Sequence, residues 1–426
     1  MKIYREEAKT LPVAGEYDVL VIGSGPAGMG AAIMAARGGA KVLVLEQSGM
    51  AGGVSTAGLM SHWTGTSGSN LYREILIRSA EKNEGDFKNR PVIEIDPEKL
   101  KLLYLEMLEE AGASIRFYSF VSAPIMEGDR IAGVITESKS GREAFLAKIV
   151  IDASGDGDVA AKAGVPYFMG RESDGKMQPA TIMFKVAGVD YDRAVFLPSF
   201  ESTYETSRGE LQALAREHLP APAGHVLLYK STLPGVVTCN MTNCTGIDGT
   251  DVESLTRAEI ECRKQIYAIE AFLREFVPGY ENCYVISAAP MVGIRETRHF
   301  KGLYTITEED ILEARVFDDW VVRGAHFNFD VHNIEGAGLD KTGQQKYFPQ
   351  AKGYTIPYRC LIPEGVKGLL LAGRNISGTH MAHSNYRVMP ICLAMGEGAG
   401  AAAAIAVAKG IDPHEVDVKE IQEKLI

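Results

Sequence analysis

Apolar residues near the start of the chain form two short runs separated by a stretch of small residues. The first run, YDVLVIG, covers residues 17–23 and enters a glycine-rich turn, and the second, AKVLVLE, covers residues 40–46. Near-continuous apolar runs of this length are typical of buried parallel strands. Residues 26–37 lie between them, are rich in alanine and glycine, and predict a helix. The segment therefore predicts a strand–helix–strand unit of a parallel sheet.

The pattern changes after residue 113. Residues 113–151 alternate apolar and polar positions, with turn sequences at EGD and KSG, and end in the apolar run KIVIDAS. Such alternation predicts an antiparallel meander of about three strands that leads into another buried strand.

The middle of the chain mixes strand and helix patterns, and the last section returns to an apolar strand and a helix. TIMFKVAG and HVLLYK predict strands. Thr256 with Glu259 predicts the start of a long helix that ends near Val277, and Thr307 with Asp310 predicts another helix start. GLLLAG (368–373) predicts a buried strand, and residues 388–409 predict an alanine- and glycine-rich helix.

Together these patterns predict an α/β protein with two domains. A Rossmann-like domain, with a parallel sheet and an antiparallel meander, is expected from residues 1–165 and 355–426. Residues 166–354 are expected to form an inserted α+β substrate or cap domain. A length of 426 residues suits two domains better than one.

Composition narrows the class of protein. Hydrophobic residues make up 46% of the chain, which favours a large folded core. The net charge of −11 disfavours nucleic acid or an anionic membrane as the main partner, although a cleft can still attract a small anion. The charged N-terminus lacks the apolar core of a signal peptide, and no uninterrupted apolar run approaches the ~20 residues of a membrane span. Six cysteines without a CxxC pair suggest buried thiols in a reducing compartment, so we expect a cytoplasmic protein.

The turn after the first strand has the sequence Gly-Ser-Gly-Pro-Ala-Gly, a GxGxxG motif between a strand and a helix. Gly23 would allow the tight turn, Gly25 would let the backbone approach a pyrophosphate, and Gly28 would let the helix pack closely on the strands. The helix N-terminus would bind the phosphates. Glu46, at the end of the second strand, is placed to bind ribose hydroxyls. The motif therefore predicts a dinucleotide site.

Further motifs connect this site to a known family. The pattern GxGxxGxxxA…E…GG, followed by DASGDGD and LLLAGR, resembles the FAD-dependent oxidoreductases of the glutathione-reductase-type fold. GIRETRHFKG, YTIPYRCLIP and LLLAGRNISGTHMAHSNYRVMP resemble, more narrowly, a family grouped with the fumarate reductase and succinate dehydrogenase flavoproteins. The resemblance spans most of the chain and implies a noncovalent FAD cofactor.

The resemblance also implies which residues would bind FAD. For the ADP half these are Gly23, Gly25, Pro26, Ala27, Gly28, Glu46 and Gln47, with Val121 at the adenine. Gly52 and Gly53 would lie beneath the flavin, and Ala153, Gly155 and Asp156 would pass close to the pyrophosphate and ribose. Gly373 and Arg374 would reach the ribityl-pyrophosphate; many relatives have an aspartate where this chain has Arg374, but an arginine can pair with pyrophosphate directly. Met389 and Pro390 begin a helix whose dipole would point at the flavin N1/O2 edge.

The segment VGIRETRHF (292–300) supplies the first candidates for catalysis. Arg295 and Arg298 are three residues apart and would share one face if the segment were helical. A solvated edge with internal salt bridges is the alternative for such a charged run. In the resemblance the segment belongs to the cap over the flavin, with Arg295 binding a substrate carboxylate or another oxygen that develops charge.

Other residues have suitable chemistry near the expected flavin contacts. The catalytic candidates are Arg295, His299, His332, Tyr358 and His380, and the substrate-binding candidates are Arg295, Arg298, His62 and Arg359. Asp330 and His332 could form an orienting pair or simply pack in the cap. His380 and His383 would face the same way in a helix, but the segment looks like a loop without a nearby acidic ligand, so we expect no metal site.

The function predicted from these features is hydride transfer between flavin N5 and a small polar organic substrate, expected to be anionic. A single GxGxxG gives no dedicated NAD(P)H domain, so a role for NAD(P)H stays open. The alternatives are an NAD(P)H-dependent flavin monooxygenase and a flavoprotein subunit that passes electrons to a partner protein. A homodimer is compatible with a chain of this size.

Overall fold

The central sheet is formed by the apolar runs near both ends of the chain. The computed structural model describes residues 3–199, 202–338 and 353–426. Parallel strands lie in the order β3-β2-β1-β6-β17, with bounds Ser114–Arg116, Val42–Leu45, Val13–Ile22, Gly141–Asp152 and Leu369–Leu371. The last strand comes from the C-terminal section, so residues far apart in the sequence complete one sheet.

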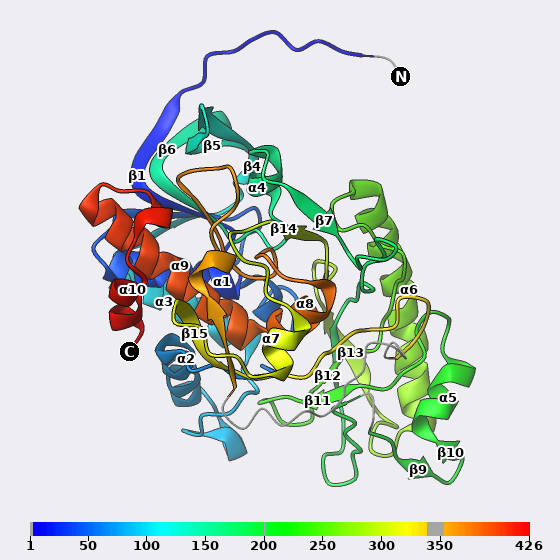
Figure 1. The fold of residues 1–426 in the computed structure, drawn as a ribbon. Coiled ribbons are helices and arrows are strands. Elements are labelled where there is room, and N and C mark those ends of the chain that lie inside the picture. The colour runs from blue at the N-terminus through cyan, green and yellow to red at the C-terminus, as the bar shows by residue number, and fades with distance from the viewer. Residues whose placement is uncertain (1–2, 200–201, 339–352) are drawn as a thin grey trace.

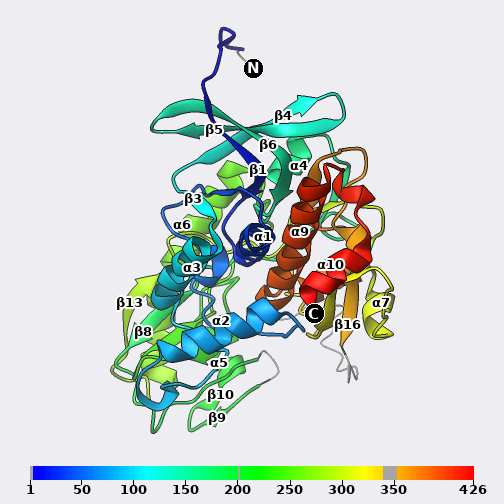
Figure 2. The ribbon, with the colours of Figure 1, turned by 90° about the vertical axis from the view of Figure 1, so that its left-hand side faces the viewer.

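The predicted meander is confirmed. Strands β4 (Phe120–Glu127) and β5 (Arg130–Ser138) pair antiparallel, and β5 pairs with residues 141–146 of β6. Residues 144–152 of β6 pair with β1, and residues 150–152 at its far end pair with β17. β6 therefore joins the antiparallel meander to the parallel sheet, and the meander lies at the top of Figure 1 and Figure 2.

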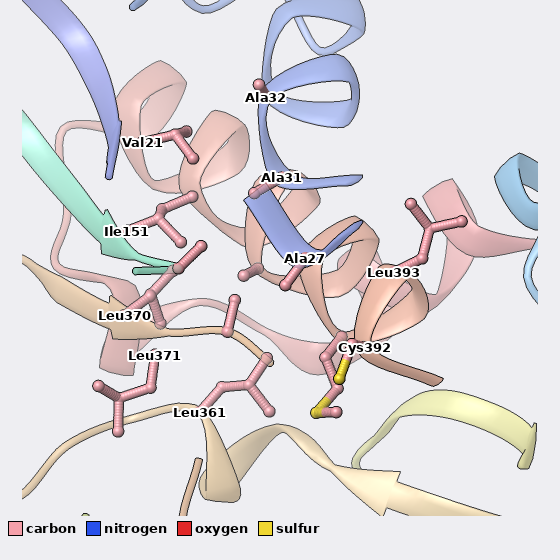
Figure 3. Close-up of a cluster of buried hydrophobic side chains, with 14 of the residues drawn as sticks. Val21, Ala27, Ala31, Ala32, Ile151, Leu361, Leu370, Leu371, Cys392 and Leu393 are labelled. Carbon is pink, nitrogen blue, oxygen red and sulfur yellow. The ribbon is translucent and has the colours of Figure 1, made fainter. Parts of the chain in front are cut away.

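Helices α1 (Pro26–Arg37) and α9 (Met389–Lys409) lie side by side against the sheet (Figures 1 and 2). In Figure 3, Ala27 and Ala31 of α1 lie between Val21, Ile151 and Leu370 of three strands and Leu393 of α9. The remaining helices of this region are α2 (Asn70–Glu81), α3 (Pro97–Ala111), α4 (Asp158–Lys162) and α10 (Val418–Leu425).

The crossing of α1 and α9 depends on glycine. A Cβ atom on Gly396 would lie 1.9 Å from the carbonyl oxygen of Ala27, and one on Gly400 would lie 2.3 Å from that of Ala31. On the other helix, a Cβ on Gly30 would lie 2.4 Å from the carbonyl oxygen of Leu393. Gly396 and Gly400 therefore permit contact between two helices, whereas Gly398 faces Val321 of the strand β15 (Trp320–Ala325).

Helix α9 is long and apolar enough to cross a membrane by length and composition, and it is the one such helix among the described residues. Its most apolar window is 83% buried within the fold. An all-round apolar helix is also what the core of a large protein requires, and the packing of α9 on α1 accounts for its composition.

The middle section forms a second sheet, in the order β11-β12-β8-β13 (Leu228–Lys230, Val237–Cys239, Phe184–Ala187 and Tyr284–Ala288). The long helix α6 spans Val252–Phe276. Its N-cap is Asp251, whose side chain accepts a hydrogen bond from the Ser254 N–H, so the predicted start at Thr256 was wrong. Thr256 instead lies in the first turns and donates to the Val252 carbonyl oxygen. Helix α5 (Leu211–His218) and the short pair β9 (Glu205–Thr206) and β10 (Gly209–Glu210) complete this region.

Two ribbons and two short helices connect the sheets. Strand β7 (Tyr167–Met169) pairs with β14 (Arg298–Phe300), and β15 pairs with β16 (Tyr354–Pro357). Helix α7 (Glu308–Leu312) begins at the predicted Thr307–Asp310 capping box. Helix α8 (His380–Tyr386) replaces the loop that we expected there.

The described residues contain two apolar cores. One includes the central sheet, α1 and α9, together with residues between Phe300 and Ile362. The other is made mostly of residues between Ala180 and Val292. All six cysteines are buried and reduced. The α/β class with a mixed Rossmann-like sheet and additional antiparallel sheets is thus confirmed; residues 339–352 of the predicted middle domain lie outside the described residues.

Candidate dinucleotide and substrate site

A cavity of about 440 Å³ lies at the carboxyl ends of β1, β2 and β6, the edge where open α/β sheets bind ligands. The cavity also reaches residues of the second sheet, so both cores contribute to it. Most of the predicted cofactor residues line it: Gly23, Gly25, Pro26, Ala27, Glu46, Gln47, Gly53, Val121, Ala153, Gly155, Asp156, Gly373, Arg374 and Met389. Gly28, Gly52 and Pro390 do not line it but neighbour residues that do.

The glycine turn has the geometry that a phosphate cradle requires. Gly23 has φ +89°, a left-handed conformation that favours glycine. A Cβ on Gly28 would lie 1.9 Å from the Gly23 carbonyl oxygen, so this position needs glycine for close packing. A Cβ on Gly25 would meet no protein atom within 4 Å, although Gly25 lines the cavity. The absent side chain of Gly25 therefore leaves room for a ligand rather than for the protein.

The carboxylate of Glu46 is held by the same turn. Its Oε2 accepts hydrogen bonds from the Ser24 N–H at 2.9 Å and the Ser24 hydroxyl at 2.6 Å, and its Oε1 accepts from the Ser48 N–H at 2.8 Å. A carboxylate fixed at the end of the second strand is the arrangement expected for a ribose partner.

Arg374 also lines the cavity and has one hydrogen-bond donor without a partner among the described residues. Its Nη2 donates to Asp156 Oδ1 at 2.9 Å, and Thr297 donates to the same oxygen at 2.7 Å. The Nη1 of Arg374 is buried and has no hydrogen-bond partner among the described residues. A buried unpaired donor is costly, so a guanidinium facing this cavity favours an anionic ligand such as a pyrophosphate.

The N-terminus of α9 also faces the cavity. Val388 is its N-cap and offers no side-chain hydrogen bond, while Val388 and Met389 line the cavity. Uncapped N–H groups at the start of a 21-residue helix carry partial positive charge, which stabilises negative charge nearby. Pro390 lies in the first turn, where its missing N–H costs nothing.

The glycine cradle, the Glu46 carboxylate and the unpaired Nη1 of Arg374 fit a dinucleotide, and comparison with known families decides which dinucleotide it is. A family described as FAD dependent oxidoreductase matches residues 18–425. The chain belongs to this family. FAD is accordingly its cofactor. The protein is an oxidoreductase with the Rossmann-like nucleotide-binding fold that its motifs predicted.

Curated relatives are similar in sequence to part of this chain. Digeranylgeranylglycerophospholipid reductase 1 of Methanopyrus kandleri is 29% identical over 208 residues, which cover 44% of this chain and 51% of the relative. Digeranylgeranylglycerophospholipid reductase 2 of the same organism is 30% identical over 159 residues, which cover 33% of this chain and 38% of the relative. Thiamine thiazole synthase of Saccharolobus solfataricus is 30% identical over 162 residues, which cover 35% of this chain and 58% of the relative. The chain thus spans between about two fifths and three fifths of the length of these relatives.

Among solved structures, a geranylgeranyl bacteriochlorophyll reductase-like protein from Thermoplasma acidophilum superimposes with a TM-score of 0.52. The superposition covers 96% of this chain and 82% of that protein, at 15% sequence identity. Similarity at this level establishes a shared fold and leaves the substrate to be argued from the site.

In this oxidoreductase the segment VGIRETRHF is extended rather than helical, so Arg295 and Arg298 do not share a helix face. Arg295 lines the cavity and is 8% exposed, and its Nη1 donates to the Pro179 carbonyl oxygen at 2.5 Å. Arg298 does not line the cavity; it donates to Asp158 Oδ1 and to the Asp156 carbonyl oxygen, both at 2.8 Å. The segment is therefore neither a solvated edge nor a uniform anion site.

Arg295 is one member of a buried charge cluster. The Asp330 carboxylate accepts from Arg387 Nη2 at 2.9 Å and lies 3.4 Å from His332 Nε2. Burial and the charge of Arg387 lower the pKa of Arg295 to about 10, so the guanidinium stays protonated at neutral pH. Burial and the charge of Arg295 lower the pKa of His332 to about 4, so this imidazole is neutral there. Burial alone would raise the pKa of Asp330, but interaction with His332 and Arg387 lowers it.

The other predicted catalytic and substrate residues lie outside the cavity lining. His299 and His380 bond the buried Glu296, and Tyr358 donates to the Pro413 carbonyl oxygen at 2.8 Å. Arg359 pairs with Asp319 and is about half exposed. His62 adjoins the site, because its ring stacks 4.6 Å from that of Tyr229, which does line the cavity. The structure thus separates these five residues from Arg295 and His332.

Sequence reasoning missed Tyr229 and Asn240, which line the cavity from the second sheet and the segment after it. Burial raises the pKa of Tyr229 above its ordinary value, which keeps its phenol protonated. Both residues lie within patterns that read as ordinary strands, HVLLYK and VVTCNM, so no local motif distinguishes them.

Gly25→Ala is expected to leave the fold intact and to weaken FAD binding at least about tenfold, because the new methyl group enters the cradle and not the protein. The backbone at Gly25, with φ −64° and ψ 179°, accepts alanine. Flavin retention after gel filtration, and titration of the apoprotein with FAD, would measure the effect. A variant that unfolds, or one that binds FAD as tightly as the parent, would contradict this description of the cradle.

Acid is expected to destabilise the protein through His332 and His225, whose pKa burial lowers to about 4 and about 3. The unfolded chain takes up protons near pH 6.5 while these folded imidazoles stay neutral, so stability falls as pH drops from about 6.5 toward 4. For His332 the loss is roughly 2 kcal/mol by pH 4.5. Melting temperatures measured between pH 7.5 and 4.5 should fall less steeply for His332→Gln; equal slopes would contradict the assigned pKa.

Proposed function

We propose that this enzyme transfers a hydride between flavin N5 and a small polar, anionic organic substrate whose negative group binds Arg295. The observation that carries the proposal is the charge of the buried cluster. Arg295 and Arg387 are cationic, Asp330 is the carboxylate paired with them among the described residues, and His332 is neutral at pH 7. Two cations and one anion leave one net positive charge in this buried cluster, which the negative group of an anionic substrate would neutralise.

Each residue has a role that follows from its position. FAD, when bound, supplies the acceptor or donor for a hydride. Arg295 binds and orients the substrate oxygen, and Asp330 holds Arg387 beside it. His332 is neutral and lines the cavity, so it can accept a proton from the substrate; Tyr229 keeps its proton and can donate a hydrogen bond.

The rest of the substrate would meet apolar side chains. Met183, Leu227, Met291, Val292 and Ile294 line the same cavity from the second core and the segment beside it. Such a lining excludes water from the reacting atoms and strengthens the interaction between Arg295 and its anion.

Anaerobic reduction of the purified yellow protein tests the proposal. Hydroxy acids, amino acids and enoates, together with NADH and NADPH, would each be assayed by bleaching of the flavin absorption band. Rapid bleaching by a carboxylate-bearing substrate, and not by its amide, would support an anion bound by Arg295. Rapid bleaching by NAD(P)H alone would favour a reductase or monooxygenase, and bleaching only with a partner protein would favour an electron carrier.

A further inference from the structure

Three side chains that the substrate site does not use meet in the interior. Glu296 and His299 belong to VGIRETRHF, and His383 belongs to α8. Each offers one ligand atom, and these atoms all lie within 4.8 Å of one another. The three side chains are between 0% and 1% exposed. None of them lines the cavity, so the cluster is separate from the FAD and substrate site.

The carboxylate of Glu296 is already oriented. Its Oε1 accepts from His299 Nε2 at 2.9 Å and from His380 Nδ1 at 2.6 Å, and its Oε2 accepts from the Gln178 N–H at 3.0 Å. The hydrogen bonds from His380 and Gln178 orient this carboxylate from outside the coordination sphere. His380 is thus a positioning residue for Glu296. His299 is itself a proposed ligand, because its other ring nitrogen, Nδ1, is buried and has no hydrogen-bond partner among the described residues.

His383 contributes a buried imidazole to the cluster. Its Nδ1 is buried and has no hydrogen-bond partner among the described residues. Its ring makes an edge contact with that of His299, with ring centroids 4.8 Å apart. An unpaired ring nitrogen in a buried imidazole is the group that a metal ion would bind. The nearby guanidiniums of Arg374 and Arg387 are each paired with a carboxylate, Asp156 and Asp330.

We propose that Glu296, His299 and His383 bind a divalent transition-metal ion of the zinc type. Two imidazoles and one carboxylate are a donor set that zinc accepts. Zinc bonds of about 2.0–2.1 Å in a tetrahedral site would place the ligand atoms roughly 3.4 Å apart. Atoms now within 4.8 Å would therefore need shifts on the order of 1 Å, which side-chain rotation provides.

The position of the cluster gives the ion a structural role. Helix α8 ends one turn before the N-terminus of α9, and Glu296 follows Arg295 directly. An ion between them would fix the start of α9 relative to the segment that carries Arg295. The sequence expectation of no metal rested on the lack of an acidic residue near His383, and the fold supplies one 87 positions earlier, in Glu296.

Metal binding by the FAD-loaded protein tests the proposal without reference to activity. After treatment with a chelator, the protein would be incubated with Zn²⁺, passed through gel filtration and analysed for metal. We expect about one zinc per chain and a melting temperature higher than that of the chelated protein. Co²⁺ in the same site should give the intense visible absorption of tetrahedral coordination. No retained ion, or only the weak spectrum of an octahedral surface ion, would overturn the proposal in the unmodified protein.

Variants assign the ligands. His383→Ala and Glu296→Gln should each lose the bound zinc, while His414→Ala, which removes a 42% exposed histidine elsewhere on the chain, should keep it. The visible flavin spectrum shows whether each variant is folded. Zinc retained equally by His383→Ala would overturn the site, and if that variant does not fold, the Co²⁺ spectrum of the unmodified protein decides.

Discussion

Replacing Arg295 with alanine is expected to lower kcat/KM by about 10²–10³-fold while FAD stays bound. Arg295 is buried, lines the substrate end of the cavity and is protonated at neutral pH. Removing one partner of a buried, hydrogen-bonded charge pair costs roughly 3–4 kcal/mol. Each 1.36 kcal/mol corresponds to about tenfold in rate. Steady-state kinetics with the substrate identified by anaerobic bleaching, together with the flavin content of the variant, would measure this.

Two further variants make the test specific. Arg359→Ala should change kcat/KM little, because Arg359 pairs with Asp319 near the surface and does not line the cavity. Arg295→Lys keeps the charge but loses the planar fork, so it should recover only part of the activity. Unchanged turnover in Arg295→Ala, or an equal loss in Arg359→Ala, would remove Arg295 from the mechanism.

Gly396→Ala is expected to destabilise the protein by about 1–2 kcal/mol and to weaken FAD binding. The new Cβ would lie 1.9 Å from the Ala27 carbonyl oxygen, a backbone atom that cannot move without shifting α1. Alanine gains roughly 1 kcal/mol of helix propensity over glycine, but overpacking between two helices costs more. Because Ala27 lines the cavity, displacement of α1 would also disturb the cofactor site.

The matched control is Gly336→Ala. A Cβ there would make an ordinary contact of 3.5 Å with Asn333 Nδ2, so the melting temperature should change little. Thermal unfolding and FAD titration of both variants would separate the clash from a general effect of the substitution. Equal melting temperatures for Gly396→Ala and the parent would show that the two helices can separate without cost.

Local signals account for the parts of the fold that were predicted well. Residues 26–37 formed the predicted helix with the same bounds, because Gly25 and Pro26 start it and Gly38 ends it. The helix at residues 252–276 began earlier than predicted because Asp251, not Thr256, caps it. Both residue types cap helices well, and only the surrounding backbone decides between them.

The residues of the candidate site also divide into those that a local motif predicts and those that only the fold brings together. The glycine turn, Glu46 and the segments at residues 153–156 and 373–374 each carry a local motif, and the parallel sheet brings their strand ends to one edge. His299, Tyr358, His380 and Arg359 have the right chemistry for a site, but their side chains point to other partners. Tyr229 and Asn240 line the cavity from a strand and the segment that follows the next one, where no motif marks them.

The sequence by itself determined the α/β class, the dinucleotide cradle and membership of the FAD dependent oxidoreductase family, because glycine spacing and apolar periodicity are local properties of the chain. Only the tertiary structure decided that Arg295 lines the cavity while Glu296, the next residue, bonds His299 and His380. These two residues lie outside any helix or strand, so the packing around them, and not a local period, determines which side chain reaches the ligand.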